Sequence, residues 1–353
     1  MRETIYLNMP VSEMFGWGVC GRHLLKEFSK CYDVRYIEDG YTDQIRNKKH
    51  NDMVNQFKSS ISEDVNAPFI HTISSHIFKP VVRYKGEPNI GYIFFETENI
   101  PQEFINNLKE SCDVIVAGSQ WNVNILKNYG IDAELALQGV DQNNYLPRVI
   151  DRPKKFWDKF IIFSGGKYEH RKAQDIVIKA VAELQKRHED VLLLASWINI
   201  FDEKYNDISN IEKEIVDQGV NNYHLLPMIF SPSTMAYYMN MSDIGLFPNR
   251  YEGGTNLVLM EYLACSKPVI ANVSTGQSDV LKSAYSFNIS GNDDDLLDSA
   301  ISYLEYAYDH RDEIKHMGKI ASDWMCRFSW QNTAEEFTRI INKYKGVSIC
   351  QIS

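Results

Sequence analysis

The residues that could do chemistry gather in one stretch, 244–281, where two glutamates flank a pair of glycines. Gly253 and Gly254 follow a short apolar run and precede an apolar helical pattern. A glycine loop that leads into a helix offers unpaired backbone N–H groups and the positive end of the helix dipole, which suits a phosphate. Glu252 lies in the loop and Glu261 about two turns into the helix, and carboxylates accept hydrogen bonds from vicinal hydroxyls. Phosphate donors beside hydroxyl acceptors predict a sugar-nucleotide site.

The same stretch contains the elements that must position these residues. Residues 244–247 form a short apolar run that predicts a strand, and Pro268 opens a second buried strand. Between them we expect a helix that begins near Thr255 or Asn256 and includes Leu257. A structural interpretation stays open, because paired glycines before a helix are common in α/β loops and a glutamate on a helix is usually solvated.

A second candidate phosphate site follows the apolar run at 160–164. Gly166 ends that run, and Lys167, Arg171 and Lys172 surround the entrance of the next amphipathic helix. Cations at a helix N-terminus oppose the helix dipole unless an anion lies there. The cluster therefore predicts a diphosphate site, with exposed surface lysines as the alternative.

The first 150 residues alternate short apolar runs with amphipathic stretches. This alternation predicts a parallel, doubly wound α/β sheet. The predicted strands are TIYLNM, DVRYIE, PFIHTI, IGYIFF, DVIVAG and AELALQ.

The first turn of this half contains a second pattern. Gly16, Gly18 and Gly21 match the G-x-G-x-x-G fingerprint of a dinucleotide site, and Glu38 lies near the expected acidic position. An NAD-dependent oxidoreductase is therefore one hypothesis. Two features argue against it. Several residues separate the strand from the first glycine, and the bulky side chain of Trp17 does not suit a pyrophosphate site.

Other polar residues of this half are weaker candidates. Glu96 and Glu98 follow a predicted strand at the edge where open α/β sheets bind ligands, and we expect Glu96 to be a cleft residue. His71 is expected in a buried strand rather than in catalysis. The basic stretch 44–60 predicts an amphipathic helix, either a solvated element or one that faces an acceptor or a membrane.

Length and composition limit the remaining classes. At 353 residues the chain predicts two domains, and a net charge of −10 argues against nucleic acid as the main partner. The six cysteines are scattered without a C-x-x-C pair, which argues against a metal cluster and fits a cytoplasmic protein. No apolar run approaches the ~20 residues that cross a bilayer, and the N-terminus predicts a strand rather than a signal peptide.

Three segments, 112–147, 163–185 and 243–281, resemble the family 4 retaining glycosyltransferases, glycosyl transferases of group 1. The resemblance implies the GT-B fold, two Rossmann-like doubly wound domains that face a central cleft. It also implies the domain bounds, with an acceptor-side domain at 1–150 and a nucleotide-sugar domain at 151–330. The helix in 331–353 would pack back on the first domain.

The resemblance also assigns roles to residues. Lys167 and Lys172 have the spacing of the family's diphosphate-binding cations, and Arg171 could substitute for either. Glu261 matches the second glutamate of the family motif and would bind the donor ribose, whereas the family spacing places the first glutamate at Gly253 rather than at Glu252. The remaining implied contacts are backbone contacts to the nucleotide base at Leu226 and Met228, and a cleft-side turn at Gly16, Trp17 and Gly18.

The residues predict a sugar-nucleotide site, and the resemblance implies a retaining enzyme that transfers a sugar from a UDP- or GDP-linked donor to a hydroxyl acceptor. No cofactor and no metal are expected, because the acidic run Asp293 to Asp295 predicts a helix cap. Two other classes stay open: a GT-B isomerase or epimerase of nucleotide sugars, and a non-catalytic sugar-nucleotide-binding protein. Peripheral membrane contact is a further expectation, and the sequence leaves the oligomeric state undetermined.

Overall fold

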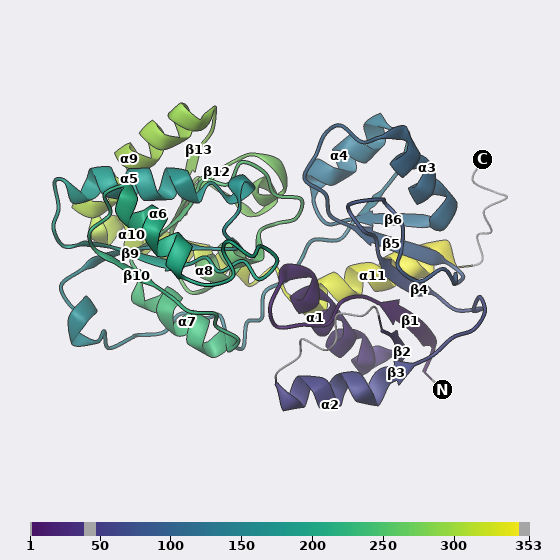
Figure 1. The fold of residues 1–353 in the computed structure, drawn as a ribbon. Helices are drawn as coiled ribbons and strands as arrows, with labels where there is room; N and C mark the ends of the chain where they lie inside the picture. The colour runs from purple at the N-terminus through teal and green to yellow at the C-terminus, as the bar shows by residue number, and fades with distance from the viewer. Residues whose placement is uncertain (1, 39–46, 346–353) are drawn as a thin grey trace. The chain divides into compact units, whose positions relative to one another are not determined.

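The computed structural model describes residues 2–38 and 47–345, which divide into two compact units (Figure 1). Unit 1 comprises the described residues of Met1–Gly139 and of Phe328–Ser353, and unit 2 is Val140–Arg327. The division falls at Gly139, ahead of the predicted boundary at residue 150. The predicted linker after residue 147 belongs to unit 2, because Arg148 N donates to Asn240 Oδ1 at 2.8 Å and Arg152 pairs with Asp243 at 2.5 Å.

Unit 1 is built on a parallel sheet in the order β3-β2-β1-β4-β5-β6-β7. The predicted strands of this half are all present, although the sixth is only two residues long. A further short strand, β3, follows the basic helix. The bounds are β1 (Thr4–Asn8), β2 (Asp33–Ile37), β3 (Lys58–Ser59), β4 (Phe69–Thr72), β5 (Asn89–Ile93), β6 (Val114–Ala117) and β7 (Glu134–Leu135).

The last helix of the described chain packs on the first helix of unit 1. Phe337 in α11 meets Phe28 in α1 with ring centroids 6.0 Å apart, and Trp330 stacks on His23 at 5.1 Å. The C-terminal helix thus completes the core of the first unit although it is far away in sequence. The helices of unit 1 are α1 (Gly16–Cys31), α2 (Lys48–Phe57), α3 (Gln102–Ser111), α4 (Gln120–Asn128) and α11 (Trp330–Tyr344).

Unit 2 has a second parallel sheet in the order β10-β9-β8-β11-β12-β13. Its inner strands are buried along their whole length, as expected for a parallel sheet with helices on both faces. The bounds are β8 (Phe160–Gly165), β9 (Val191–Ser196), β10 (Tyr223–Leu225), β11 (Ile244–Phe247), β12 (Val269–Asn272) and β13 (Ser286–Ile289).

The helices of unit 2 begin with local sequence signals. A Ser231 cap precedes Pro232 at the start of α7, and Asn292 forms a capping box with Asp295 at the start of α9. The acidic run 293–295 is therefore the first turn of a helix, as predicted. The helices are α5 (Gln174–Gln185), α6 (Ser209–Asp217), α7 (Pro232–Met241), α8 (Leu257–Ala264), α9 (Asp293–Asp309) and α10 (Arg311–Met325).

Both sheets reverse their strand order at one point. In unit 1 the reversal lies between β1 and β4, and in unit 2 between β8 and β11. Open α/β sheets bind ligands at the carboxyl ends of the strands beside such a reversal. The loops after these four strands are therefore the places where a ligand site is expected.

Candidate active site

The loop after β8 carries the predicted cations on an unusual backbone. Gly166 has φ +127°, which a residue with a side chain rarely adopts, and Ala173 is held in the left-handed region at φ 57°. Between them a single 3-10 turn, His170–Lys172, leads into α5. This backbone brings two consecutive cations, Arg171 and Lys172, to one side of the loop.

The loop after β11 is anchored on both sides of Glu252. The backbone N–H of Glu252 donates to Thr275 Oγ1 at 2.9 Å, and its carbonyl accepts from Gly276 N at 2.8 Å. A Cβ on Gly276 would lie 2.3 Å from the carbonyl oxygen of Gly254, so only glycine fits there. The backbone around Glu252 is thereby fixed against the segment that follows β12.

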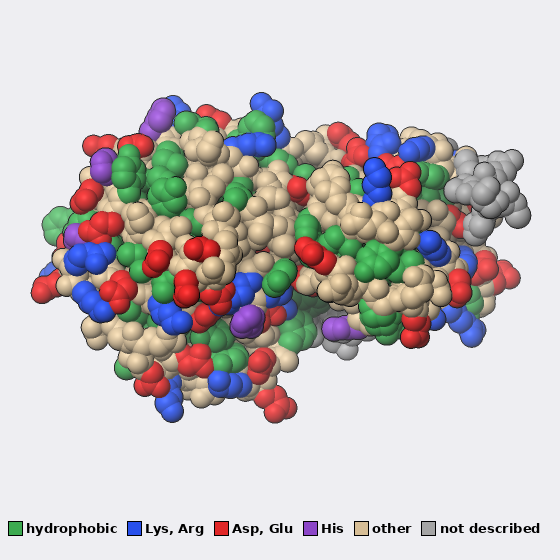
Figure 2. All heavy atoms as spheres, turned by 90° about the horizontal axis from the view of Figure 1, so that it is seen from above, with side chains coloured by type: hydrophobic (Ala, Val, Ile, Leu, Met, Phe, Trp, Pro, Cys, Tyr) green, Lys and Arg blue, Asp and Glu red, His purple; other side chains and the backbone are tan. Residues whose placement is uncertain are grey.

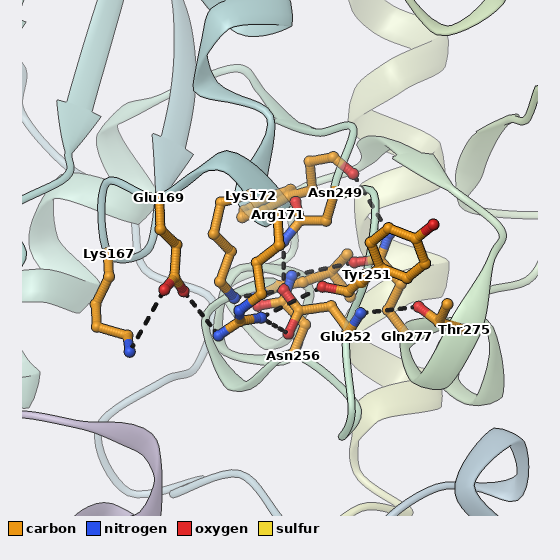
Figure 3. Close-up of polar contacts among 12 residues, drawn as sticks. Lys167, Glu169, Arg171, Lys172, Asn249, Tyr251, Glu252, Asn256, Thr275 and Gln277 are labelled. Carbon is orange, nitrogen blue, oxygen red and sulfur yellow. Dashed lines mark hydrogen bonds and ion pairs between the residues drawn. The ribbon is translucent and has the colours of Figure 1, made fainter. Parts of the chain in front are cut away.

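The two loops meet at the carboxylate of Glu252 (Figure 3). Lys172 Nζ pairs with one carboxylate oxygen, and Arg171 donates to the other at 2.9 Å. Asn249 also donates to this carboxylate. The side chains of Lys172 and Glu252 are only 10% and 6% exposed, so the pair is buried beside the strand-order reversal.

The charges of this cluster depend on one another. Burial alone would raise the pKa of Glu252, but Lys172 and Arg171 outweigh it and hold the pKa below its usual value. Burial lowers the pKa of Lys172, and the ion pair with Glu252 opposes this only in part. The cluster therefore holds an ionised carboxylate, and cations that an additional anion would stabilise.

Lys167 lies apart from this ion pair. Its ammonium group is 3.7 Å from Glu169 and 5.2 Å from the ring centroid of Phe201, and in Figure 3 it lies apart from Glu252. Glu169 also pairs with Arg171 at 2.8 Å. Of the three predicted cations, the structure brings Arg171 and Lys172 together on Glu252.

The glycine loop leads into α8 as predicted. Asn256 is the N-cap, with φ 61°, and its side chain accepts from Leu259 N and donates to Gln277 at 3.1 Å. Thr255 is buried beside it, and Leu257 is the first helical residue. Gly253 and Gly254 are not among the positive-φ residues of the described chain, so backbone strain is not the reason for these glycines.

The remaining predicted donor residues lie on two elements of unit 2. Glu261 is half-buried on α8, within the helix that follows the glycine loop. Leu226 is buried just after β10, where its N–H donates to Ala195 O at 2.8 Å, and Met228 is half-buried in the loop that follows.

In unit 1 the glycine turn differs from a dinucleotide fingerprint. Gly16 is the first residue of α1, and Gly18 and Gly21 lie inside the helix. A Cβ on Gly21 would be 2.1 Å from Pro10 O, so this glycine allows the helix to pack on the loop after β1. Gly16 is thus helical and lies well after the end of β1, whereas the fingerprint places its first glycine in the tight turn that follows the strand, which argues against the NAD hypothesis.

The other candidates of unit 1 separate into surface and core. Trp17 is half-buried against Phe94, with ring centroids 4.5 Å apart. Glu96 is exposed two residues further along, just after β5. His71 is fully buried in β4, and its Nε2 donates to Asn89 Oδ1 at 2.9 Å, so it is a core residue as expected.

The basic helix is α2, and the predicted residues 44–46 lie outside the described residues. No group of three or more His, Cys, Asp or Glu among the described residues is placed to hold a metal ion. No helix in this part of the chain is long and apolar enough to cross a membrane. On the face shown in Figure 2, basic and acidic side chains are interspersed.

Sequence reasoning missed Arg250. Its guanidinium lies between Asp175 and Asp293, at 2.9 and 2.8 Å. Asp293 is far from the basic loop in sequence, but Arg250 joins it to that loop in space by donating to both Asp293 and His170 O. No signal in the sequence could have found this contact, because Arg250 and Asp293 are 43 positions apart.

The second unit contains a match to a known family. Residues 148–321 match the model of the glycosyl transferases group 1. A curated relative, the D-inositol 3-phosphate glycosyltransferase of Paenarthrobacter aurescens, is 24% identical over 227 residues, which cover 60% of this chain and 52% of the relative. The chain thus spans about half the length of that relative.

Solved structures establish the fold. Sucrose-phosphate synthase from Thermosynechococcus elongatus superposes with a TM-score of 0.73 at 13% identity, covering 98% of this chain and all of that one. HepE from Anabaena in complex with UDP-glucose gives 0.70 at 14% identity, with 96% and 99% covered. A glycosyltransferase from Rickettsia africae gives 0.73 at 15%, with 98% and 100% covered. The chain has the GT-B fold, with two Rossmann-like parallel-sheet domains, as predicted.

Proposed function

We propose that this protein is a family 4 retaining glycosyltransferase, which moves a sugar from a UDP- or GDP-linked donor to a hydroxyl acceptor. One observation carries the proposal: Lys172 and Arg171 converge on Glu252 beside the glycine loop, at the strand-order reversal of unit 2. The match of residues 148–321 to glycosyl transferases group 1 supports the reaction class. HepE in complex with UDP-glucose supports the donor class.

The proposed roles follow from charge and position. Breaking the glycosidic bond develops negative charge on the diphosphate, and Lys172 and Arg171 can stabilise that charge. Glu252 holds both cations in place while the site is empty. Gly253 and Gly254 leave room for the sugar phosphate beside α8, whose N-terminus adds backbone donors in Thr255, Asn256 and Leu257.

The nucleoside would lie further along the same edge of the sheet. We assign the donor's ribose hydroxyls to Glu261, and the base to the backbone near Leu226 and Met228. Gly166 lets the basic loop approach the phosphates, and Lys167 is a secondary cation at the rim. These assignments rest on the motif resemblance and on the position of each residue in a loop or helix that follows a strand of unit 2.

The acceptor is assigned to unit 1. The candidates are Gly16, Trp17 and Gly18 at the strand-order reversal, and exposed Glu96 after β5. Hydroxyl acceptors fit the relatives, which include a D-inositol 3-phosphate glycosyltransferase and a sucrose-phosphate synthase. The scattered cysteines favour a cytoplasmic location, and α2, which has Lys48 and Lys49 in its first turn, is the candidate for peripheral membrane contact.

Transfer is proposed to need no metal, because cations already occupy the place where the leaving group develops its charge. The activity should persist in excess EDTA, whereas restoration of lost activity by Mg²⁺ or Mn²⁺ would contradict this part of the proposal. Retention is tested separately, by NMR assignment of the anomeric configuration of donor and product.

The decisive assay is release of nucleoside diphosphate from a panel of UDP and GDP sugars, with and without hydroxyl acceptors. We expect release that depends on both a donor and an acceptor. Conversion of the nucleotide sugar without an acceptor would favour the isomerase or epimerase. Tight donor binding without turnover across the acceptor panel would favour the binding protein.

A further inference from the structure

Arg250, two residues before Glu252, has a guanidinium whose five N–H donors are all used. Nε and one Nη of Arg250 donate to the two oxygens of Asp293, both at 2.8 Å. The Nη atoms also donate to the two oxygens of Asp175, at 3.0 and 2.9 Å, and to His170 O at 2.7 Å. The side chain is only 8% exposed.

This guanidinium connects three segments of unit 2 to the loop that carries Glu252. Asp175 lies in the first turn of α5 and Asp293 in the first turn of α9, where carboxylates suit the helix dipole. His170 belongs to the 3-10 turn that carries the site cations. The backbone adds a further link, because Arg250 N donates to Arg171 O at 2.8 Å.

The basic loop needs such support. Ala173, which immediately follows Lys172, is in the left-handed region, which is unfavourable for a residue with a side chain. Such a conformation persists only where neighbouring contacts impose it. Arg250 supplies contacts on both sides of this residue, at His170 and at Asp175.

We propose that Arg250 is a positioning residue, which holds the loop of Arg171 and Lys172 in register with Glu252. The proposal rests on the proposed function, because it adds a residue that acts on the reaction through the donor-site cations. Arg250 positions the loop by geometry as well as by charge. Its planar guanidinium donates to two carboxylates at once, which an ammonium group cannot do with the same geometry.

The first test is a double-mutant cycle with Arg250→Gln and Lys172→Ala, measured as kcat/KM for the donor sugar nucleotide. Arg250→Gln should lower kcat/KM by roughly tenfold to a hundredfold, the range expected for a small displacement of catalytic groups. In the Lys172→Ala background it should cost clearly less, because one of the two cations that it positions is absent. Equal losses in both backgrounds would overturn the positioning role.

Conservative variants and a matched control separate positioning from general stability. Arg250→Lys should fail to restore activity, whereas Asp293→Asn, which weakens one of two carboxylate contacts, should give an intermediate loss. The control is Arg187→Gln, because Arg187 follows α5 and pairs with Glu305 of α9 at 2.6 Å, away from the site. Full activity of Arg250→Lys would show that charge alone suffices and would overturn the proposal.

The second test does not require a substrate. Amide hydrogen exchange of residues 166–175 should become faster in Arg250→Gln and remain unchanged in Arg187→Gln. Unchanged exchange in Arg250→Gln would overturn the positioning role even if sugar transfer is established. A wild-type protein that binds no sugar nucleotide, while Arg250→Gln still loosens the loop, would instead overturn the proposed function.

Discussion

The side chains of Lys172 and Glu252 form a buried ion pair that joins the loops after β8 and β11, two neighbouring strands of unit 2. Desolvating two charges is costly, so a buried pair is weak evidence for stability. Removing one partner is costly as well, because the other charge is left buried and uncompensated. The proposed function explains the pair, because a bound diphosphate would replace Glu252 as the partner of Lys172 and Arg171.

Glu252→Gln tests whether the carboxylate holds the cations rather than binds the donor. The substitution removes a negative charge next to the proposed diphosphate while it keeps the side-chain shape. We expect the affinity for a nucleoside diphosphate to be unchanged or up to about tenfold tighter, and kcat to fall about tenfold or more. The measurements are calorimetric binding and steady-state kinetics.

The control for this prediction is Glu169→Gln, which removes the other carboxylate on Arg171 but leaves Lys172 paired. Its effect on kcat should be smaller. A clear loss of nucleoside diphosphate affinity in Glu252→Gln would show that Glu252 contacts the donor directly.

Gly254 of the glycine loop can be compared with Gly276, which packs against it from the segment after β12. Because Gly254 does not have positive φ, Gly254→Val should leave the melting temperature nearly unchanged and abolish transfer by filling the space for the sugar phosphate. Gly276→Ala should lower the melting temperature, since its Cβ would lie 2.3 Å from Gly254 O. Full transfer activity in a well-folded Gly254→Val protein would remove the glycine loop from the site.

The decline of donor affinity at high pH should depend on the protonation of Lys172. Only the protonated ammonium binds a phosphate well, and burial lowers the pKa of Lys172. Donor affinity should therefore decline as pH rises, and earlier than for an ordinary exposed lysine. Lys172→Arg should remove this decline below about pH 10, because a guanidinium stays charged. An identical decline in both proteins would assign it to another group.

His71 should affect the acid stability of unit 1 rather than catalysis. Burial lowers the pKa of His71 to about 4, whereas an unfolded histidine titrates near 6.5. The unfolded chain therefore binds more protons between these values, so stability is lost as pH falls from about 6.5 to 4. The loss attributable to His71 is up to about 3 kcal/mol.

Urea unfolding at several pH values measures this effect. In His71→Gln the free energy of unfolding should fall less steeply as pH drops from about 6.5 to 4. Transfer kinetics near neutral pH should be altered little in that variant. A pH dependence that is unchanged in His71→Gln would contradict the assignment of His71 as a buried neutral group.

The fold could be predicted because its signals are local. Apolar runs such as those at 160–164 and 244–247 became β8 and β11, and the glycine loop led into α8 at Leu257. The weakest of the predicted strands is β7, only two residues long at the edge of its sheet, where fewer neighbours support an extended run.

The site could be predicted only in part, because its contacts join distant segments. Spacing alone favoured Lys167 and Lys172, but the backbone turn at Gly166 directs Lys167 toward Glu169 and leaves Arg171 beside Lys172. The role of Arg250 depends on the starts of α5 and α9 lying next to each other. That proximity comes from the packing of the sheet and its helices rather than from any local pattern.

The central claim is that unit 2 binds a nucleotide sugar through its cationic loop and α8, and equilibrium binding tests it most directly. A panel of UDP and GDP sugars should be titrated into wild type, Lys172→Ala, Glu261→Ala and the control Lys186→Ala, whose side chain is 66% exposed at the end of α5. We expect one donor class to bind the wild type and the control equally. Lys172→Ala and Glu261→Ala should each lose roughly 1.5–3 kcal/mol, the contribution of a hydrogen bond to a charged group. Absence of binding to the wild type, or equal binding to all four proteins, would contradict the account.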